Sequence, residues 1–391
     1  MTKKDLLTDD AKHMSRLMSS RKHPYWSDVT DAQWSDWKWQ QSHRVRTIAQ
    51  LREIFPEAAD QFDWAAIEAA AERFPMGVTP YYLSLVQQAS WADPIWRQVV
   101  PSGDELRGYD DALEDPLAEE AYMPVPGITH RYPDRVLFYT HHHCAMYCRH
   151  CNRRRKVGDP FSAPDRAQLA EGIRYIQETT SVRDVLISGG DPLTYNEKRL
   201  EFILSGLREA EHLDIIRIAT RNPVTLPQRV TPALTALFKE HHPIYVSVHF
   251  NHLAECTPEA GEALNALADA GCVVGNQMVL LKGVNEDAEM VREMNRWLLR
   301  HRCRPYYIFQ CDSVEGASHF KTPTKTGVDL IQKIRGWTSG LAVPHYVVDL
   351  PKGGGKVSLG PNYLKEHEGN RLRFENYAGE EYEYIEGEPE P

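Results

Sequence analysis

The sequence predicts an α/β protein built on a mostly parallel β-sheet, and two observations lead to this prediction. From Val136 onward, seven short β-rich runs alternate with six helical stretches, which is the pattern of repeated βα units. Polar signatures also follow several strands at their carboxyl ends, where the loops of such units converge. The pattern alone does not decide whether the sheet opens as a doubly wound fold or curls into a barrel.

The elements follow one another in a regular order. The expected strands are Val136–Thr140, Asp184–Ser188, Ile215–Thr220, Ile244–Phe250, Val273–Leu281, Pro305–Cys311 and His345–Leu350. The expected helices between them are Asp165–Thr179, Glu197–Ala210, Pro232–His241, Pro258–Ala270, Ala288–His301 and Lys325–Trp337.

Three segments differ in composition, and we expect an N-terminal helical region over 1–105, a βα region over 106–350 and a C-terminal segment over 351–391. The N-terminal segment holds a group of tryptophans that is typical of a core or a subunit contact: Trp26, Trp34, Trp37 and Trp39. Residues 106–134 are punctuated by proline and are expected to be loop. Glu380–Pro391 contains six Glu and no basic residue, which predicts a solvated tail.

Composition excludes several classes of protein. The chain of 391 residues is 42% hydrophobic and 26% charged, as in a globular protein, with a net charge of −10 that disfavours a general nucleic-acid binder. Its longest apolar runs are strand-sized, so no membrane span is expected. Met1–Asp10 lacks the apolar stretch of a signal peptide. Seven cysteines are too few for a disulfide scaffold, and together these features favour a reduced, cytoplasmic protein.

Three cysteines follow the first strand at the spacing C-x3-C-x2-C: Cys144, Cys148 and Cys151. Within one loop their sulfurs can converge on a single metal centre. Structural zinc needs a fourth ligand, which His143 or His150 could supply. A four-iron cluster held by three cysteines keeps one iron open, as catalysis requires. Chance grouping of unreactive cysteines is the weakest interpretation.

This spacing resembles the signature of the radical S-adenosylmethionine superfamily. The resemblance implies that the three cysteines hold a [4Fe–4S] cluster and that S-adenosylmethionine binds the open iron. It also implies a cofactor-binding role for residues of the next strand end and of a later strand: Ser188, Gly189, Gly190, Asp191 and Gln277. Glycines there let the backbone approach a ligand, although the glycine pair standing alone would favour a plain tight turn.

A second feature is Lys356, which follows three glycines after the last strand. The segment is not a P-loop, because Val follows the lysine. It could cradle a phosphate, form a Schiff base or carry an ordinary surface lysine.

Together with the cysteines, the lysine loop resembles the lysine 2,3-aminomutase family over nearly the whole chain. Further matching segments are Trp34–Gln40, Thr79–Ser84, Pro126–Val136, Gly275–Gln277, Arg304–Tyr307 and His319–Pro323. The resemblance implies a partial (β/α)6 parallel barrel of radical S-adenosylmethionine type, with an N-terminal helical extension and a short C-terminal segment.

The family resemblance assigns the cofactor pyridoxal 5′-phosphate to Lys356. It places Arg131 and Arg135 at the phosphate and Tyr132 against the ring. Two arginines four residues apart beside an aromatic suit a phosphate on a flat ring, although a surface ion-pair patch would have the same sequence.

The resemblance further assigns the substrate carboxylate to Arg153 and the distal ammonium of lysine to Asp312 and Asp349. The implied reaction is a radical 1,2-amino shift that converts L-lysine to L-β-lysine. Two carboxylates favour a basic substrate over glutamate but do not separate lysine from arginine or ornithine. Two other functions, modification of a lysine on a translation factor and a non-catalytic iron–sulfur carrier, are disfavoured by the long N-terminal segment and by Lys356, respectively.

The implied partners are an amino-acid substrate, an electron donor such as flavodoxin or ferredoxin, and further copies of the chain, with no nucleic acid and no membrane. Some family members carry a zinc site with a cysteine after Gly-Val-Asn, but here Glu286 and Asp287 follow Asn285, and no cysteine lies beyond Cys311. Lys352 adds a charge to a loop that is usually all glycine. The remaining cysteines are expected to be ordinary buried or strand residues: Cys256, Cys272, Cys303 and Cys311.

Overall fold

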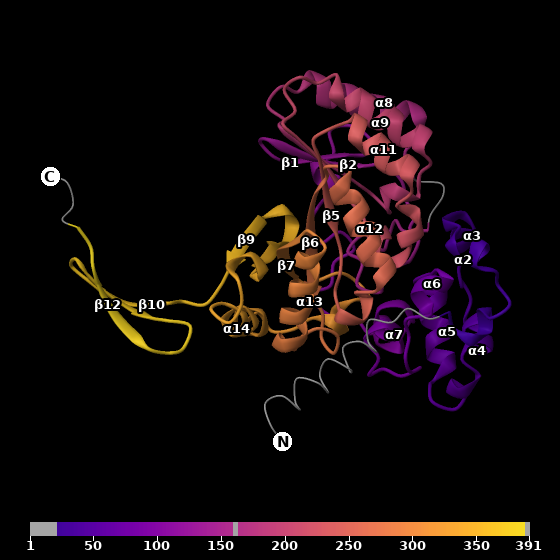
Figure 1. Cartoon of the computed structure of the whole chain (residues 1–391), viewed down its shortest axis with the longest axis horizontal. Helices are drawn as coiled ribbons and strands as arrows, with labels where there is room; N and C mark the ends of the chain where they lie inside the picture. Colours follow the sequence, from indigo (N-terminus) through magenta and orange to yellow (C-terminus); the bar gives the residue numbers. More distant parts are fainter. Residues whose placement is uncertain (1–21, 159–162, 388–391) are drawn as a thin grey trace.

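The computed structural model describes residues 22–158 and 163–387. Its main feature is a nine-stranded sheet in the order β1 to β9, curled into a half-barrel (Figure 1). Strands β2 to β8 run parallel to one another, and β1 and β9 pair antiparallel with β2 and β8 at the two edges. The strands are β1 Ile128–Tyr132, β2 Arg135–Tyr139, β3 Asp184–Ser188, β4 Ile215–Ala219, β5 Ile244–Val248, β6 Val273–Leu280, β7 Cys303–Gln310, β8 His345–Leu350 and β9 Gly355–Leu359.

One long helix connects each pair of adjacent parallel strands and packs outside the sheet (Figure 1). These helices are α8 Arg166–Glu178, α9 Glu197–Arg208, α11 Pro232–Glu240, α12 Pro258–Asp269, α13 Ala288–Arg300 and α14 Thr324–Ile334. Local chemistry fixes their starts: Thr257 caps α12 with Pro258 at its first turn, and Asp287 caps α13. In α13, Val291, Met294 and Leu298 share one face and are buried.

The predicted strands and helices are confirmed to within one or two residues at almost every end, and the half-barrel answers the choice that the sequence pattern left open. Two edge strands were not expected. Strand β1 lies in the segment predicted to be loop, and β9 follows the glycine-rich turn. Both edges of the parallel sheet are therefore extended by one antiparallel strand.

The N-terminal segment forms short helices beside the barrel (Figure 1). They are α2 Asp31–Ser35, α3 Trp37–Ser42, α4 Ile48–Ile54, α5 Trp64–Arg73, α6 Pro80–Leu83 and α7 Pro94–Val99. Their buried side chains, among them Leu51, Ile95 and Trp96, belong to the same hydrophobic cluster as the barrel strands. Of the four tryptophans, Trp26 is buried in this cluster, Trp34 and Trp39 are half-buried and pack against it, and Trp37 is half-buried. The expectation that the chain lacks a signal peptide concerns residues 1–21, which lie outside the described residues.

A second sheet follows the barrel and extends away from it (Figure 1). Its antiparallel strands are β10 Leu364–Glu368, β11 Arg371–Glu375 and β12 Glu381–Ile385. The prediction of a tail over Glu380–Pro391 is wrong in one respect, because β12 lies within it, although all five residues of β12 are exposed. Among the described residues, no helix combines the length and apolarity needed to cross a bilayer.

Candidate active site

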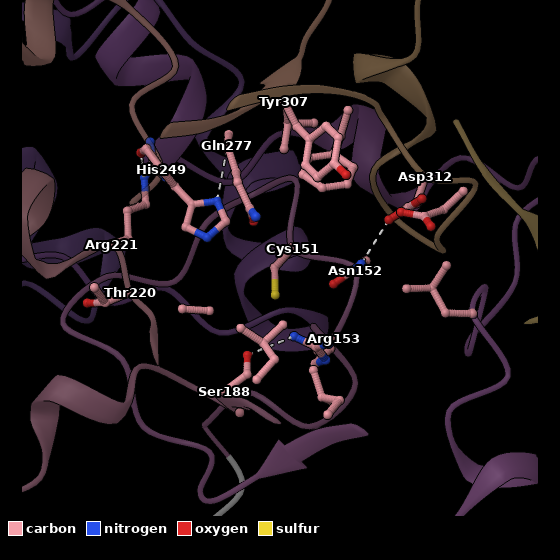
Figure 2. Close-up of a pocket in the computed structure, with 18 of the residues that line it drawn as sticks. Cys151, Asn152, Arg153, Ser188, Thr220, Arg221, His249, Gln277, Tyr307 and Asp312 are labelled. Atoms are coloured by element: carbon pink, nitrogen blue, oxygen red, sulfur yellow. Dashed lines mark hydrogen bonds between the residues drawn. The ribbon is translucent and has the colours of Figure 1, made fainter. Parts of the chain in front are cut away.

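A cavity of about 790 Å³ opens at the carboxyl ends of the parallel strands and continues into the half-barrel. Every sequence-predicted site residue lines it: Arg131, Tyr132, Arg135, Cys144, Cys148, Cys151, Arg153, Ser188, Gly189, Gly190, Asp191, Gln277, Asp312, Asp349 and Lys356. These residues come from segments more than 200 positions apart. The parallel sheet gathers at one edge the residues that follow its strands. Others lie within strands or in the edge hairpins: Gln277 in β6, Lys356 in β9, and Arg131, Tyr132 and Arg135 in the β1–β2 hairpin. Figure 2 shows Cys151, Arg153, Ser188, Gln277 and Asp312 around this space.

The cysteine loop follows β2, and its three thiols are free and partly buried. Among the described residues, no three His, Cys, Asp or Glu side chains are already grouped closely enough to mark a metal site by geometry alone. The fit of an iron–sulfur cluster therefore rests on the donor set, three thiols on one loop that face one cavity. Arg221 adds a guanidinium nitrogen 2.9 Å from the Cys148 sulfur, which suits a thiolate ligand.

The glycine pair after β3 lies against the start of the cysteine loop. A Cβ atom on Gly190 would lie 2.1 Å from the His143 carbonyl oxygen, and one on Gly189 would lie 2.5 Å from that of His141. The backbone N–H of Asp191 donates to the His143 carbonyl at 2.6 Å. Glycine is thus required here by contact between two stretches of backbone, and the same contact places Ser188–Asp191 beside the cysteines.

The carboxylate of Asp191 links two loops of the site. It accepts hydrogen bonds from the Thr220 hydroxyl at 2.7 and 2.9 Å and from the Arg221 backbone N–H at 2.7 Å. Burial raises the pKa of Asp191. Asp191 therefore holds the β3 and β4 loops together, whatever it contributes to a ligand.

Of the three histidines before the first cysteine, His141 has a structural role. His141 is buried and its Nε2 lies 2.8 Å from the Asp191 carbonyl oxygen, and burial lowers its pKa to about 3. A different histidine, His249, also lines the cavity (Figure 2). It begins one of the polar signatures that follow the predicted strands, His249–His252, but the sequence assigns it no role. Its Nδ1 is 3.1 Å from the Gln277 carbonyl oxygen, and burial lowers its pKa to about 4, so it is neutral at pH 7.

At the lysine end of the cavity, Lys356 and Asp349 are directly paired residues of the β8–β9 hairpin. The Lys356 ammonium donates to both carboxylate oxygens of Asp349 at 2.8 Å and lies 4.4 Å from the Phe309 ring centre. The Tyr132 hydroxyl accepts the Lys356 backbone N–H at 3.0 Å. The lysine is thereby fixed by its strand register rather than by a flexible loop.

The two arginines of the β1–β2 hairpin lie against Tyr132. Their guanidinium carbons are 4.8 Å (Arg131) and 4.1 Å (Arg135) from the tyrosine ring centre. A flat aromatic, two guanidinium groups and a lysine amine in one cavity match the ring, phosphate and aldehyde of pyridoxal 5′-phosphate. Lys352, in contrast, is exposed, has a φ of 57° and does not line the cavity, so its charge faces solvent.

Arg153 follows the last cysteine of the loop by two residues, Asp312 follows β7 by two residues, and both line the cavity. Arg153 donates to Glu119 at 2.7 Å and to the Ser188 hydroxyl at 3.3 Å. Asp312 accepts a hydrogen bond from Asn152 at 2.8 Å, and burial raises its pKa to about 6, with a further contribution from the charge of Asp349 (Figure 2). Glu119 was missed from the sequence, because it belongs to an acidic stretch 34 residues before its partner.

Comparisons with known proteins agree with this arrangement. Residues 138–294 match the family model described as the radical SAM superfamily, and residues 331–390 match that of lysine-2,3-aminomutase. An L-lysine 2,3-aminomutase of Clostridium subterminale is 43% identical over 362 residues, covering 93% of this chain and 86% of that protein. One of Bacillus subtilis is 43% identical over 94% of this chain and 76% of its own. A glutamate 2,3-aminomutase of Clostridioides difficile is also 43% identical, over 86% of this chain and 79% of its own.

Identity alone therefore does not separate the two substrates named among these relatives. It does extend over most of each chain, through both the barrel and the lysine hairpin. The chain belongs to the lysine 2,3-aminomutase family of radical S-adenosylmethionine isomerases, whose members imply the use of a [4Fe–4S] cluster, S-adenosylmethionine and pyridoxal 5′-phosphate.

Proposed function

We propose that the protein moves the α-amino group of free L-lysine to the β-carbon and so forms L-β-lysine. The observation that carries this proposal is the charge arrangement of the cavity. Among the charged side chains that line the cavity, the guanidinium of Arg153 and the carboxylates of Asp312 and Asp349 are the ones that the proposal assigns to the substrate. A substrate with a carboxylate at one end and an ammonium at the other complements both groups.

Arg153 is the proposed clamp for the substrate carboxylate. Glu119 holds the guanidinium at its Nε and Nη2 atoms, while Nη1 faces Ser188. An arginine anchored in this way keeps its planar fork in one orientation, which favours a bidentate contact with a carboxylate.

Asp312 and Asp349 are the proposed partners of the distal ammonium. Their mutual repulsion contributes to the raised pKa of Asp312, so a cation between them relieves a real cost. A glutamate side chain would instead bring a third negative charge to this place. At about 4 Å, such a repulsion costs about 4 kcal/mol at an effective dielectric constant of ~20. The same pair of carboxylates is what favours lysine over the glutamate of the Clostridioides difficile relative.

We further propose that Cys144, Cys148 and Cys151 hold the cluster and that Lys356 holds pyridoxal 5′-phosphate. The proposed S-adenosylmethionine contacts are Ser188, Gly189, Gly190, Asp191 and Gln277, and those of the pyridoxal phosphate and ring are Arg131, Arg135 and Tyr132. When bound, these cofactors supply the radical and the ring system over which its unpaired electron spreads. The residues of the chain fix the substrate at both ends and surround it with protein, which keeps a reactive radical from side reactions.

We propose flavodoxin or ferredoxin as the class of electron donor, a reduced cytoplasmic setting, and a homo-oligomer. Supporting the last point, one face of the β10–β12 sheet carries Leu372, Phe374, Tyr382 and Tyr384, and the two tyrosines are 54% and 60% exposed. The opposite face is satisfied by its own ion pairs, such as Arg371–Glu383. A second copy of the chain is the proposed cover of the apolar face.

The test is anaerobic incubation of reconstituted protein with S-adenosylmethionine, a reductant and one amino acid at a time. We expect a β-isomer from L-lysine, and much less from arginine, ornithine or glutamate. Cys148→Ala should abolish turnover with every amino acid. A β-isomer formed only from one of the other three amino acids would contradict the substrate proposal, and activity in Cys148→Ala would contradict the radical mechanism.

A further inference from the structure

Arg221, the residue two positions after β4, contacts three parts of the site at once. Its Nη1 lies 2.9 Å from the Cys148 sulfur, and its Nε donates to the His249 carbonyl oxygen at 3.2 Å. Its backbone N–H donates to Asp191 at 2.7 Å. The arginine is only 8% exposed, so water does little to screen its charge from the sulfur.

The guanidinium is held from behind by a buried polar cluster. Its Nη2 donates to Gln98 at 2.6 Å, to Glu255 at 2.7 Å and to the Tyr82 hydroxyl at 3.3 Å. Glu255 is fully buried and also accepts the Tyr82 hydroxyl and the Gln98 amide. Tyr82 and Gln98 belong to α6 and α7, so the N-terminal helices fix the orientation of a cation that touches the cysteine loop.

We propose that Arg221 is a positioning residue that sets the reduction potential of the iron–sulfur cluster, with Glu255 as the opposing charge. This inference rests on the proposed role of Cys148 as a cluster ligand. One-electron reduction adds negative charge to the cluster and its sulfurs. A guanidinium that donates to one of these sulfurs stabilises the reduced state more than the oxidised state, and so raises the potential.

The guanidinium of Arg221 and the carboxylate of Glu255 are expected to shift the midpoint potential of the cluster in opposite directions. Removing Arg221 and Glu255 together, as Arg221→Gln/Glu255→Gln, deletes the donor to the sulfur without leaving a buried charge unpaired. The midpoint potential of the cluster should then become more negative. Glu255→Gln alone keeps the guanidinium and removes the carboxylate that offsets it, so the potential should become more positive. A residue that only supports the fold has no reason to give shifts of opposite sign.

The measurement is a redox titration of the reconstituted cluster, followed by electron paramagnetic resonance without substrate, together with iron and sulfide content per chain. The matched control is Arg229→Gln/Glu197→Gln, which removes a buried arginine and its half-buried glutamate partner; this arginine also donates to the Leu193 and Tyr195 carbonyls. Its potential should equal that of the wild type. If the Arg221 double variant binds no cluster, Glu255→Gln decides the matter.

Unchanged potentials, shifts in the same direction, or an equal shift in the control overturn the inference. Cys148→Ala separates this failure from failure of the proposed function. If Cys148→Ala retains full iron content, the ligand assignment itself is wrong. If it loses the cluster while the Arg221 and Glu255 variants keep the wild-type potential, only the tuning role is wrong.

Discussion

Asp312, in its proposed role at the substrate ammonium, makes the pH dependence of the reaction a test of the substrate site. Burial and the neighbouring Asp349 charge raise its pKa to about 6, while Asn152, Lys356 and Arg153 act in the opposite direction. In the folded protein the carboxyl therefore takes up a proton below about pH 6, whereas an unfolded chain holds that proton only below about pH 4. The charged form needed for an ammonium is present above about pH 6 and lost below it.

We expect kcat/KM for lysine to fall about tenfold per pH unit below about pH 6, because this parameter follows the free enzyme. Asp312→Asn should remove this acid limb. It should also lower kcat/KM at pH 8 by about 10- to 100-fold, the range for loss of a charged hydrogen bond of about 1.5–3 kcal/mol.

Steady-state kinetics from pH 5 to 8 provide the measurement, with Asp269→Asn on the exposed surface as the control. A pH profile for Asp312→Asn that matches the wild type would show that another group controls the acid limb.

At the scale of elements, the site depends on two places where backbone segments touch. The glycine pair after β3 lies against the histidines before Cys144, and the β8–β9 hairpin pairs Asp349 with Lys356. In each case backbone geometry sets the contact. A side chain added at the contact therefore displaces a loop that we propose binds a cofactor.

Gly190→Ala should lower the free energy of unfolding by about 1–3 kcal/mol, the usual cost of overpacking, and should reduce iron incorporation. The physical reason is the His143 carbonyl oxygen, 2.1 Å from where the new Cβ would lie. Thermal unfolding and iron content per chain measure the two effects.

Gly360→Ala is the matched control, because nothing lies within 4 Å of a Cβ at that position. We expect it to unfold and to bind iron like the wild type. Equal behaviour of the two alanine variants would show that the β3 loop adapts to the extra carbon at little cost.

At the scale of the molecule, the C-terminal sheet is the part that the rest of the chain leaves most exposed. Tyr382→Ser/Tyr384→Ser should reduce the mass of the assembly in solution, because the two rings form much of its uncovered apolar face. Light scattering coupled to size exclusion measures that mass. Glu381→Ser/Glu383→Ser, on the opposite face of the same strand, should leave it unchanged. An unaltered mass in the tyrosine variant would place the contact between copies elsewhere.

How much of the structure can be predicted from the sequence depends on how far apart along the chain the interacting residues lie. The parallel strands and the residues at their ends were predictable, because alternation and motif spacing are local and the sheet gathers all strand ends at one edge. The contacts of Glu119 and of Arg221 could not be predicted. Glu119 lies 34 positions from Arg153, and Tyr82 and Gln98 lie more than 120 positions from Arg221. Strand β12 escapes prediction for another reason: its alternating Glu and Tyr indicate a strand, but its acidic composition indicates a solvated tail.

Asp349, one of the two carboxylates that we propose for the substrate ammonium, is already paired with the Lys356 ammonium. Under that proposal, a substrate ammonium binds Asp349 by exchange with the Lys356 cation, and the net charge at this carboxylate is the same before and after. The affinity for lysine then depends on the difference between two similar ion pairs, Asp349 with the Lys356 ammonium and Asp349 with the substrate ammonium. Any other group that binds the Lys356 amine changes this affinity. Occupancy of the amine and occupancy of the ammonium site are coupled through a single carboxylate.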